Sequence, residues 1–297
     1  RVLPVDVKAA AVAPPPAAPP GLNSLVHTRD RLSYLLLVIV GLSVYAGGAY
    51  ALVAFPDIAT QAAGILVYIP IIALSIFFAR GMMMGHLRGN AIHVTQRQLP
   101  KVHEIAKRHA AALGLKKLPE IFFMQAGGVL NAFATRVLGR NFVVIYSDVM
   151  GMAEQRGESA VGFIVAHELA HLKRGHLQHR WLTLPGRILV PYLGPAYSRA
   201  CEYTCDRFAA HCQPDGAIDG LLVLAAGRDL YRNVDAREYA KQVETQKGFF
   251  VNRAELMATH PHLPKRVAAL LKAGIQAHVQ APSPSMPTPR SAPLAVA

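Results

Sequence analysis

The sequence predicts a mainly helical α+β fold with a small β-sheet, preceded by two transmembrane helices. Three observations lead to this prediction: two long uncharged apolar runs near the N-terminus, several later segments with helical periodicity, and two short strand-like segments. With 297 residues, the chain is long enough to form one sizeable core besides the membrane segment.

Two apolar runs are each long enough to cross a bilayer. Residues 32–55 contain no charged residue over 24 positions, and residues 58–79 contain none over 22. About 20 residues suffice to span the hydrocarbon core. A pair of buried core helices is the alternative, but such runs are rare at one end of a soluble domain. We therefore expect a transmembrane helical hairpin over residues 31–80 and no cleaved signal peptide, since the first run begins late and is too long.

Basic residues flank this hairpin, whereas its tight turn at Pro56-Asp57 contains no Lys or Arg. The positive-inside rule then places both ends of the hairpin, and the domain that follows, in the cytoplasm. The flanking basic residues are Arg29, Arg31, Arg80, Arg88, Arg97 and Lys101.

The rest of the chain divides by composition and periodicity. Residues 1–30 form a Pro/Ala-rich arm and residues 276–297 a similar tail, both expected to be disordered, and residues 90–275 form the folded domain. Strands are expected at 121–124 and 142–146, with glycine turns at Gly127-Gly128 and Gly139, in a hairpin or meander. Helices are expected at 99–115, 216–247 and 264–273.

The segment His167-Glu168-Leu169-Ala170-His171 follows an apolar run at 160–166. Residues four apart share a helix face, so both histidines can direct a ring nitrogen at one metal ion, with Glu168 placed to hold a metal-bound water. This pattern is typical of zinc hydrolases. Two histidines can also share a solvated helix face by chance, but the apolar run indicates a buried helix and favours the metal.

A zinc site of this type needs a third protein ligand. A three-histidine site would need a glycine and a histidine where the chain has Arg174 and Leu177, so that class is excluded. Glu202 and Asp206 are again four residues apart. Glu202 can complete the ligand set and Asp206 can accept the outer N–H of a ligand histidine. Two acids on an exposed face is the alternative, but the neighbouring residues Cys201, Cys205 and Ala209 indicate a buried helix, where unpaired acids are costly.

These residues carry a family resemblance that covers roughly residues 90–275. Four motifs occur in the same order as in the HtpX-like and CAAX-prenyl-protease-1-like membrane zinc metallopeptidases. They are Asn131-Ala132-Phe133-Ala134, the segment 158–176, Glu202-x-x-x-Asp206, and Thr259-His260-Pro261 with Arg266. The resemblance implies a zincin-like metalloprotease domain, which in a bacterium would be anchored in the inner membrane.

The resemblance also implies a role for each matching residue. His167, His171 and Glu202 would bind one Zn²⁺, with Glu168 as catalytic acid and base and Asp206 in contact with a ligand. Asn131 would contact the substrate backbone, although a turn residue between two strands is an equal alternative. His260 and Arg266 would stabilise the oxyanion, with His260 the first candidate, or would tie a C-terminal helix to the core.

The expected chemistry is that of a zinc hydrolase. Zinc with one open position lowers the pKa of its bound water to roughly 7, and Glu168 would take the proton of that water and pass it to the leaving amine. A positively charged group or hydrogen-bond donor besides the metal would stabilise the oxyanion. An edge strand could present the substrate in extended form.

The region 181–197 departs from the family pattern. HtpX-like proteins often have a second transmembrane pair at this point, but this insert is too short to cross twice. A single crossing would place Glu202 and His171 on opposite sides of the membrane, where they could not bind the same ion. The segment could be an interfacial or re-entrant loop at the bilayer, or a loop over the active site.

Composition narrows the possible partners. The net charge is +13, but the basic residues are scattered without interleaved aromatic residues, so we expect no nucleic-acid partner. We expect the positive charge to attract the protein to anionic lipids of the membrane surface. The three cysteines, at 201, 205 and 212, lack zinc-ribbon spacing, and their odd number indicates reduced thiols.

We therefore expect a membrane-anchored zinc metalloendopeptidase, of the EC 3.4.24 type, that cleaves unfolded or membrane-associated proteins in quality control. A dedicated processing role is a near variant, and prenyl-protein processing is disfavoured because a large multi-span chamber is absent. The alternatives are a catalytically silent membrane adaptor stabilised by zinc, and a module that binds anionic lipid surfaces. Intact Glu168 disfavours the adaptor, because a purely structural zinc site needs no general base.

Overall fold

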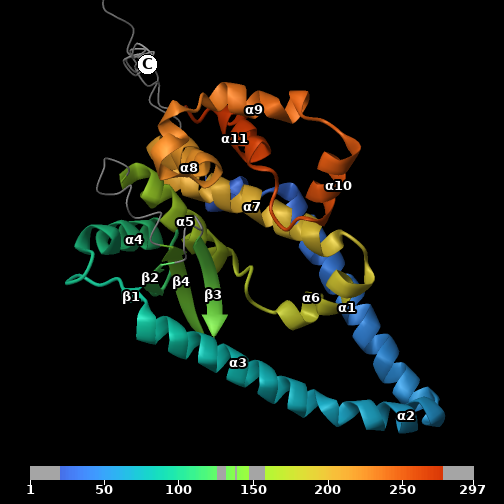
Figure 1. Cartoon of the computed structure of the whole chain (residues 1–297). Helices are drawn as coiled ribbons and strands as arrows, with labels where there is room; N and C mark the ends of the chain where they lie inside the picture. The colour runs from blue at the N-terminus through green and yellow to red at the C-terminus, as the bar shows by residue number, and fades with distance from the viewer. Residues whose placement is uncertain (1–20, 126–131, 138, 147–157, 277–297) are drawn as a thin grey trace, which may run out of the picture.

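The computed structural model describes residues 21–125, 132–137, 139–146 and 158–276 (Figure 1). The fold is mainly helical with a small mixed sheet, as predicted from the sequence. The strands are β1 (Ile92–His93), β2 (Glu120–Met124), β3 (Ala132–Val137) and β4 (Arg140–Tyr146). The helices are α1 (Thr28–Ala54), α2 (Pro56–Leu66), α3 (Tyr68–Asn90), α4 (Pro100–Ala112), α5 (Glu158–Arg174), α6 (Arg180–Leu189), α7 (Leu193–Cys212), α8 (Ala217–Leu230), α9 (Ala236–Thr245), α10 (Phe249–Met257) and α11 (Leu263–Lys272), with short 3-10 turns at Leu22–Leu25, Pro214–Gly216 and Tyr231–Asn233.

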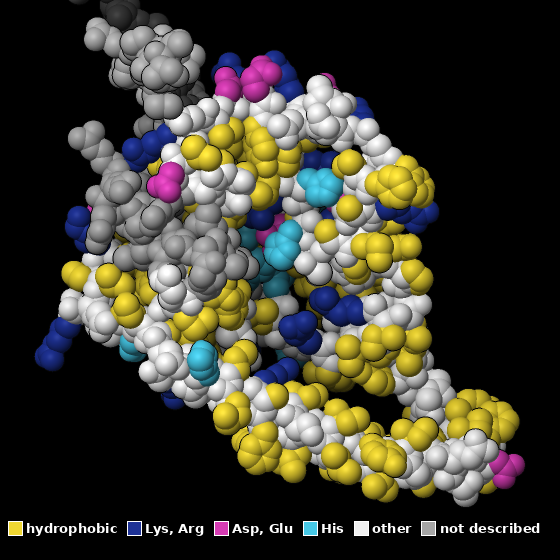
Figure 2. Space-filling model, in the orientation of Figure 1, with side chains coloured by type: hydrophobic (Ala, Val, Ile, Leu, Met, Phe, Trp, Pro, Cys, Tyr) yellow, Lys and Arg dark blue, Asp and Glu magenta, His cyan; other side chains and the backbone are white. Residues whose placement is uncertain are grey.

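The two apolar runs form helices long and apolar enough to span a membrane, α1 and the pair α2–α3. Their large apolar side chains are mostly exposed, as lipid-facing side chains are (Figure 2). The second run is divided at Val67, because Pro70 has no N–H for the Leu66 carbonyl and its ring crowds that carbonyl. From the turn at Pro56, α1 and α3 diverge toward different parts of the folded domain (Figure 1).

The sheet confirms the two predicted strands, but they pair in parallel, so they form neither the hairpin nor the meander expected of them. The strand order is β1-β2-β4-β3, with β2 parallel to β4 and β3 antiparallel to β4. The segment between the two predicted strands, β3, lies at the edge of the sheet and forms a hairpin with β4 through the turn at Gly139, where φ is +80°. The turn expected at Gly127-Gly128 lies outside the described residues.

The sheet is covered on both faces by helices of different origin. On one face, Ile121 of β2 and Val143 of β4 belong to the main core, which also contains the buried side chains of α5. On the other face, Phe122 and Val144 pack against Met84 of α3. The C-terminal end of the second membrane helix therefore forms part of the domain core.

The region expected to be a loop at 181–197 is helical: it forms α6 and the start of α7. Helix α6 packs against α1 at a very close crossing. A Cβ on Gly41 of α1 would overlap the Leu182 carbonyl, and a Cβ on Gly186 of α6 would lie 3.0 Å from Leu37. Because these contacts fall within the uncharged run of α1, α6 lies beside a candidate transmembrane helix.

Helical structure was expected in three remaining regions, and all three are helical. Residues 99–115 contain α4, which ends before Gly114 at φ +64°, and residues 264–273 lie in α11 apart from the last, Ala273. The region 216–247 is helical in pieces, because Gly227 leaves the helical conformation and Asp235 caps the start of α9. Helix α10 was not predicted.

Candidate metal centre

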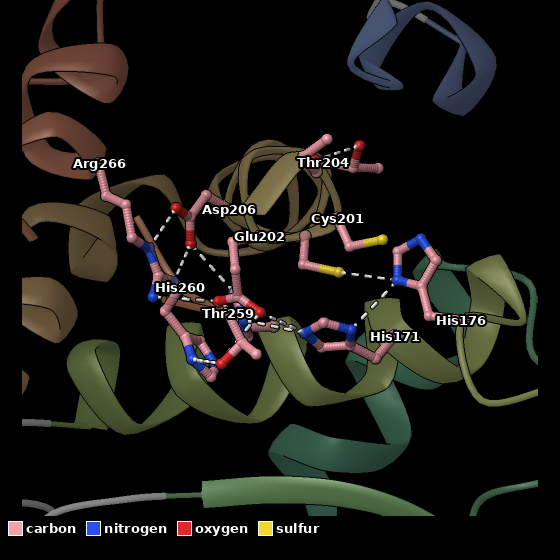
Figure 3. A network of polar contacts seen from close by, with 12 residues as sticks. His171, His176, Cys201, Glu202, Thr204, Asp206, Thr259, His260 and Arg266 are labelled. Atoms are coloured by element: carbon pink, nitrogen blue, oxygen red, sulfur yellow. Dashed lines mark hydrogen bonds and ion pairs between the residues drawn. The ribbon is translucent and has the colours of Figure 1, made fainter. Parts of the chain in front are cut away.

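The two histidines of the metal motif lie one turn apart on α5, which is buried on nearly every side. Its side chains from Ala160 to Ala170 are all buried, because the helix is enclosed by the sheet, α4, α7 and α8. His167 and His171 face α7, which supplies Glu202 and Asp206 from buried positions one turn apart. The sequence pattern therefore brings all four predicted residues together, of which Figure 3 labels His171, Glu202 and Asp206.

The Nε2 atoms of His167 and His171 and the Glu202 carboxylate form a triangle of donor groups, the donor triangle. Nε2 of His167 lies 3.3 Å from Nε2 of His171. Oε2 of Glu202 lies 3.3 Å from Nε2 of His167, and its Oε1 lies 3.3 Å from Nε2 of His171. The two imidazole nitrogens and the carboxylate thus lie close enough together to bind one ion.

This triangle fits a zinc ion. Zinc binds histidine nitrogen and carboxylate oxygen at about 2.0–2.2 Å, and in a tetrahedron such bonds separate neighbouring donors by roughly 3.3–3.6 Å. The separations of 3.3 Å meet that requirement. Two histidines and a glutamate are also a ligand set of catalytic zinc sites, which leaves a fourth position open.

Asp206 and Arg266 contact the candidate ligands His167 and Glu202. Oδ1 of Asp206 lies 3.0 Å from Nδ1 of His167, so the carboxylate can hold the ring with Nε2 directed at the metal position. Arg266 donates from Nε and Nη2 to Asp206, and its Nη1 lies 3.1 Å from Oε2 of Glu202. Arg266 is buried, so these acids engage its guanidinium fully.

The charges of the site attract a cation. Burial alone would raise the pKa of Glu202, but the Arg266 guanidinium and the two histidines of the α5 motif outweigh burial and hold this pKa well below its usual range. Burial alone would lower the pKa of His167, but Asp206 and Glu202 outweigh it and raise the pKa to about 10. Two carboxylates against one guanidinium leave a negative charge, which a proton on His167 or a metal ion can balance.

Glu168 lies beside the triangle in a pocket. The pocket is also lined by both ligand histidines, Glu202 and His260. Among the described residues, Glu168 makes no hydrogen bond or ion pair, although only 7% of its surface is exposed. Figure 2 shows histidine side chains at the floor of a hollow in the surface.

The remaining predicted residues are placed differently. His260 lies at the rim with 67% of its side chain exposed, and its Nε2 is 3.6 Å from Oε1 of Glu202. Its Nδ1 is 3.0 Å from Oγ1 of Thr259. Asn131 lies outside the described residues, whereas the next residues, Ala132 and Phe133 on edge strand β3, line the pocket.

Two residues near the site were not predicted. Nδ1 of His176 lies 3.1 Å from Nδ1 of His171, and Nε2 of His176 lies 3.4 Å from Oδ2 of Asp30. His176 follows the helix end at Gly175, so helical spacing did not associate it with the site. The one available signal for Asp30 is its position as an acid between two arginines, just before an apolar run.

The fold and this site define a membrane-associated metallopeptidase. The family model for peptidase family M48 matches residues 96–194 and 182–273, and the chain belongs to that family. The chain is 25% identical to a protease HtpX homolog of Bacillus subtilis and 28% identical to one of Bacillus pumilus, in each case across 67% of this chain and 78% of the relative. It is 24% identical to a protease HtpX homolog of Pyrococcus abyssi, across 86% of this chain and 98% of the relative. The HtpX-like resemblance is thereby confirmed.

Proposed function

We propose that this M48 peptidase is a zinc-dependent endopeptidase in which His167, His171 and Glu202 hold one Zn²⁺ and Glu168 is the catalytic acid and base. The observation that carries the proposal is the donor triangle with sides of 3.3 Å, next to the Glu168 carboxylate, which has no partner among the described residues. This arrangement favours an enzyme over a zinc-stabilised adaptor, because an adaptor needs no free carboxylate beside its ligands.

Each side chain has a definite task in this proposal. When bound, the metal would polarise the substrate carbonyl and acidify water. The Glu168 carboxylate removes a proton from the attacking water and delivers it to the leaving amine. The exposed imidazole of His260 donates toward the negative charge that develops on the carbonyl oxygen. Arg266, engaged by two acids, orients Glu202 and Asp206 instead of meeting the substrate.

The substrate would bind beside β3 in extended form. This strand pairs with β4 and lies at the sheet edge, and Ala132, Phe133 and Ala134 line the metal pocket. An extended peptide can add to such an edge by main-chain hydrogen bonds. Asn131, next to this strand, would contact the peptide backbone. An unfolded or membrane-associated protein can supply such a segment.

The membrane helices support a role in membrane protein quality control, with the catalytic domain in the cytoplasm. The donor triangle is close to the start of α1, since His176 contacts both Asp30 of α1 and His171. Basic side chains at both ends of the helical hairpin favour this orientation. A substrate would then meet the site near the bilayer surface.

The test uses the full-length protein in detergent with casein as the unfolded substrate. We expect zinc at one ion per chain, cleavage that stops with a chelator and returns with zinc, and a loss of at least about 100-fold in kcat for Glu168→Gln. Glu158→Gln, at the exposed start of the same helix, is the matched control and should cleave normally.

Three results would contradict the proposal. Equal cleavage by wild type and Glu168→Gln would remove Glu168 from the mechanism. Retention of zinc by a wild type that cleaves neither casein nor a membrane protein would favour the adaptor. Binding to anionic vesicles without zinc or hydrolysis would favour a lipid-binding module instead.

A further inference from the structure

We propose that Asp30, at the start of the first membrane helix, positions the metal ligand His171 through His176. Asp30 and His176 do not line the metal pocket, and the proposal rests on the proposed function, in which His171 binds zinc. Asp30, His176 and His171 would form one chain of hydrogen bonds that sets the orientation of the His171 ring. The metal site would thus be assembled partly by the membrane anchor.

The contacts run in sequence from α1 to α5. Nε2 of His176 lies 3.4 Å from Oδ2 of Asp30. Nδ1 of His176 lies 3.1 Å from Nδ1 of His171 (Figure 3). The opposite nitrogen of His171, Nε2, belongs to the donor triangle. Each nitrogen of both rings therefore has a partner.

The chemistry of imidazole gives this chain one direction. A neutral ring has one N–H donor and one acceptor nitrogen. For His171 to present a lone pair at Nε2, its proton must be on Nδ1, where it donates to Nδ1 of His176. His176 then carries its own proton on Nε2 and donates it to the Asp30 carboxylate. Metal-binding histidines usually fix their orientation by such an outer hydrogen bond.

Asp30 is held firmly enough to serve as the end of this chain. Only 1% of its surface is exposed. Oγ1 of Thr204 donates to Oδ2 at 2.9 Å and in turn accepts the backbone N–H of His27. Nη2 of Arg174 lies 3.5 Å from Oδ2 of Asp30. An acid buried to this degree is costly without partners, so its burial beside His176 indicates a specific role.

The two ligand histidines are thereby supported in different ways. Asp206 contacts the outer nitrogen of His167 directly, whereas a second ring separates Asp30 from His171. Asp206 belongs to the same helix as Glu202, but Asp30 belongs to the membrane hairpin. A displacement of α1 would therefore disturb His171 while leaving the support of His167 in place.

A second metal site is the competing interpretation of these residues. Ligand atoms of Asp30, His176 and Cys201 lie within 4.8 Å of one another, as do those of His171, His176 and Cys205. Burial raises the pKa of both thiols well above the usual value, which favours the protonated form over the thiolate that metals bind. Sγ of Cys205 is 3.7 Å from Nδ1 of His176, a distance that fits a weak S–H contact.

The test compares His176→Phe, His176→Gln and Asp30→Asn in the full-length protein. Phenylalanine keeps the ring shape without nitrogen, whereas glutamine can still accept from His171 and donate to Asp30. His211→Phe, at an exposed position of α7, is the matched control. Zinc affinity is measured by competition with a chelator, the ligand geometry by the absorption spectrum of the Co²⁺ form, and the fold by thermal unfolding without metal.

We expect His176→Phe to weaken zinc binding by about 10- to 100-fold and to alter the Co²⁺ spectrum. His176→Gln should recover much of the affinity, and Asp30→Asn should fall between wild type and His176→Phe. If His176→Phe does not fold, the other two variants decide. The inference would be overturned if His176→Gln and Asp30→Asn both had the zinc affinity and Co²⁺ spectrum of the wild type. It would also be overturned if His176→Gln and His176→Phe lost zinc affinity equally.

These outcomes separate the inference from the proposed function. A wild type that binds zinc without hydrolysing protein overturns the proposed enzyme, while the affinity series still tests the positioning role. An active wild type whose variants bind zinc normally overturns the positioning role alone. Binding of more than one zinc ion per chain by the wild type, with the additional ion lost in His176→Phe, would support the second metal site and contradict the inference.

Discussion

Arg266 binds both carboxylate oxygens of Asp206, with Nε 2.8 Å from Oδ2 and Nη2 2.6 Å from Oδ1. The pair connects α11 to α7 across 60 residues of sequence. The third guanidinium nitrogen reaches Glu202, so one buried cation balances two buried anions behind the metal pocket. The C-terminal helix is thereby joined to two of the residues beside the candidate metal position.

Replacement of Arg266 by leucine should destabilise the protein strongly, because two buried acids lose their counter-charge. Removal of one partner of a buried pair costs about 3–5 kcal/mol. Denaturant unfolding of the metal-free protein in detergent should show this loss. Arg237→Leu, at an exposed position of α9, is the control. An unchanged unfolding free energy for Arg266→Leu would exclude a structural role for the pair.

Replacement of His260 by alanine should affect catalysis and leave the fold intact. This imidazole is 67% exposed and faces the pocket, so its loss removes a donor without opening the core. Loss of one donor to a developing oxyanion lowers kcat by about 10²–10³-fold. Casein cleavage, zinc content and thermal unfolding should be compared with those of His211→Ala. Normal kcat with a lower unfolding temperature would instead assign His260 to tying down the C-terminal segment.

His109 should make the stability of the fold depend on pH. Burial, with a smaller contribution from Arg108, lowers the pKa of His109 from 6.5 to about 4, and only 1% of the residue is exposed. Below pH 6.5 the unfolded chain binds a proton that the folded chain does not bind until about pH 4. Stability should therefore fall as the pH falls through this window, by up to about 3 kcal/mol.

The variant His109→Gln tests this effect, since glutamine does not titrate. Unfolding free energies of both proteins should be measured from pH 7 to pH 4. The wild-type curve should fall more steeply, and the difference should level off near pH 4. Parallel curves would show that His109 has the same pKa in the folded and unfolded chains.

Trp181 should report contact between α6 and the bilayer. It is the single tryptophan of the chain and is 59% exposed, and Tyr45 of α1 donates a hydrogen bond of 2.7 Å to its carbonyl. In vesicles with brominated acyl chains, we expect strong quenching of its emission. In Gly41→Leu, the close helix crossing should separate and change that quenching.

A tryptophan at a distant site gives the control for this measurement. The double variant Trp181→Phe, Tyr239→Trp places it on α9, far from α2 (Figure 1). Its emission should respond to a soluble quencher and not to brominated lipid. Equal quenching of the two tryptophans by brominated lipid would mean that α6 has no special contact with the acyl chains.

The sequence predicted the parts of the fold and site that depend on local periodicity. The length of the two uncharged runs indicated the membrane helices, and the four-residue spacing of His167 and His171 indicated that they share one helix face. It did not predict the order of the sheet, because strand pairing depends on contacts between distant segments. Strand β3 was missed as a strand because its segment, Ala132–Val137, includes an arginine and lacks a clear apolar alternation.

The residues behind the site were predicted less well for the same reason. Asp206 was found because it shares a helix face with Glu202. Asp30 contacts His176 across 146 positions, a contact that periodicity does not reveal. Arg266 was assigned to the oxyanion as one option, whereas its bidentate contact with Asp206 favours the other option, a link to the C-terminal helix. Asn131 stays a prediction.

The packing of α3 against the sheet has a consequence for any attempt to obtain a soluble form. Met84 and Leu87, at the end of the second membrane helix, cover Phe122, Phe142 and Val144. Cleavage of the chain near residue 90 would leave these aromatic and branched side chains facing water, and would also take Asp30 away. The anchor is therefore a structural component of the catalytic unit, and a peptidase freed from its membrane helices would be incomplete.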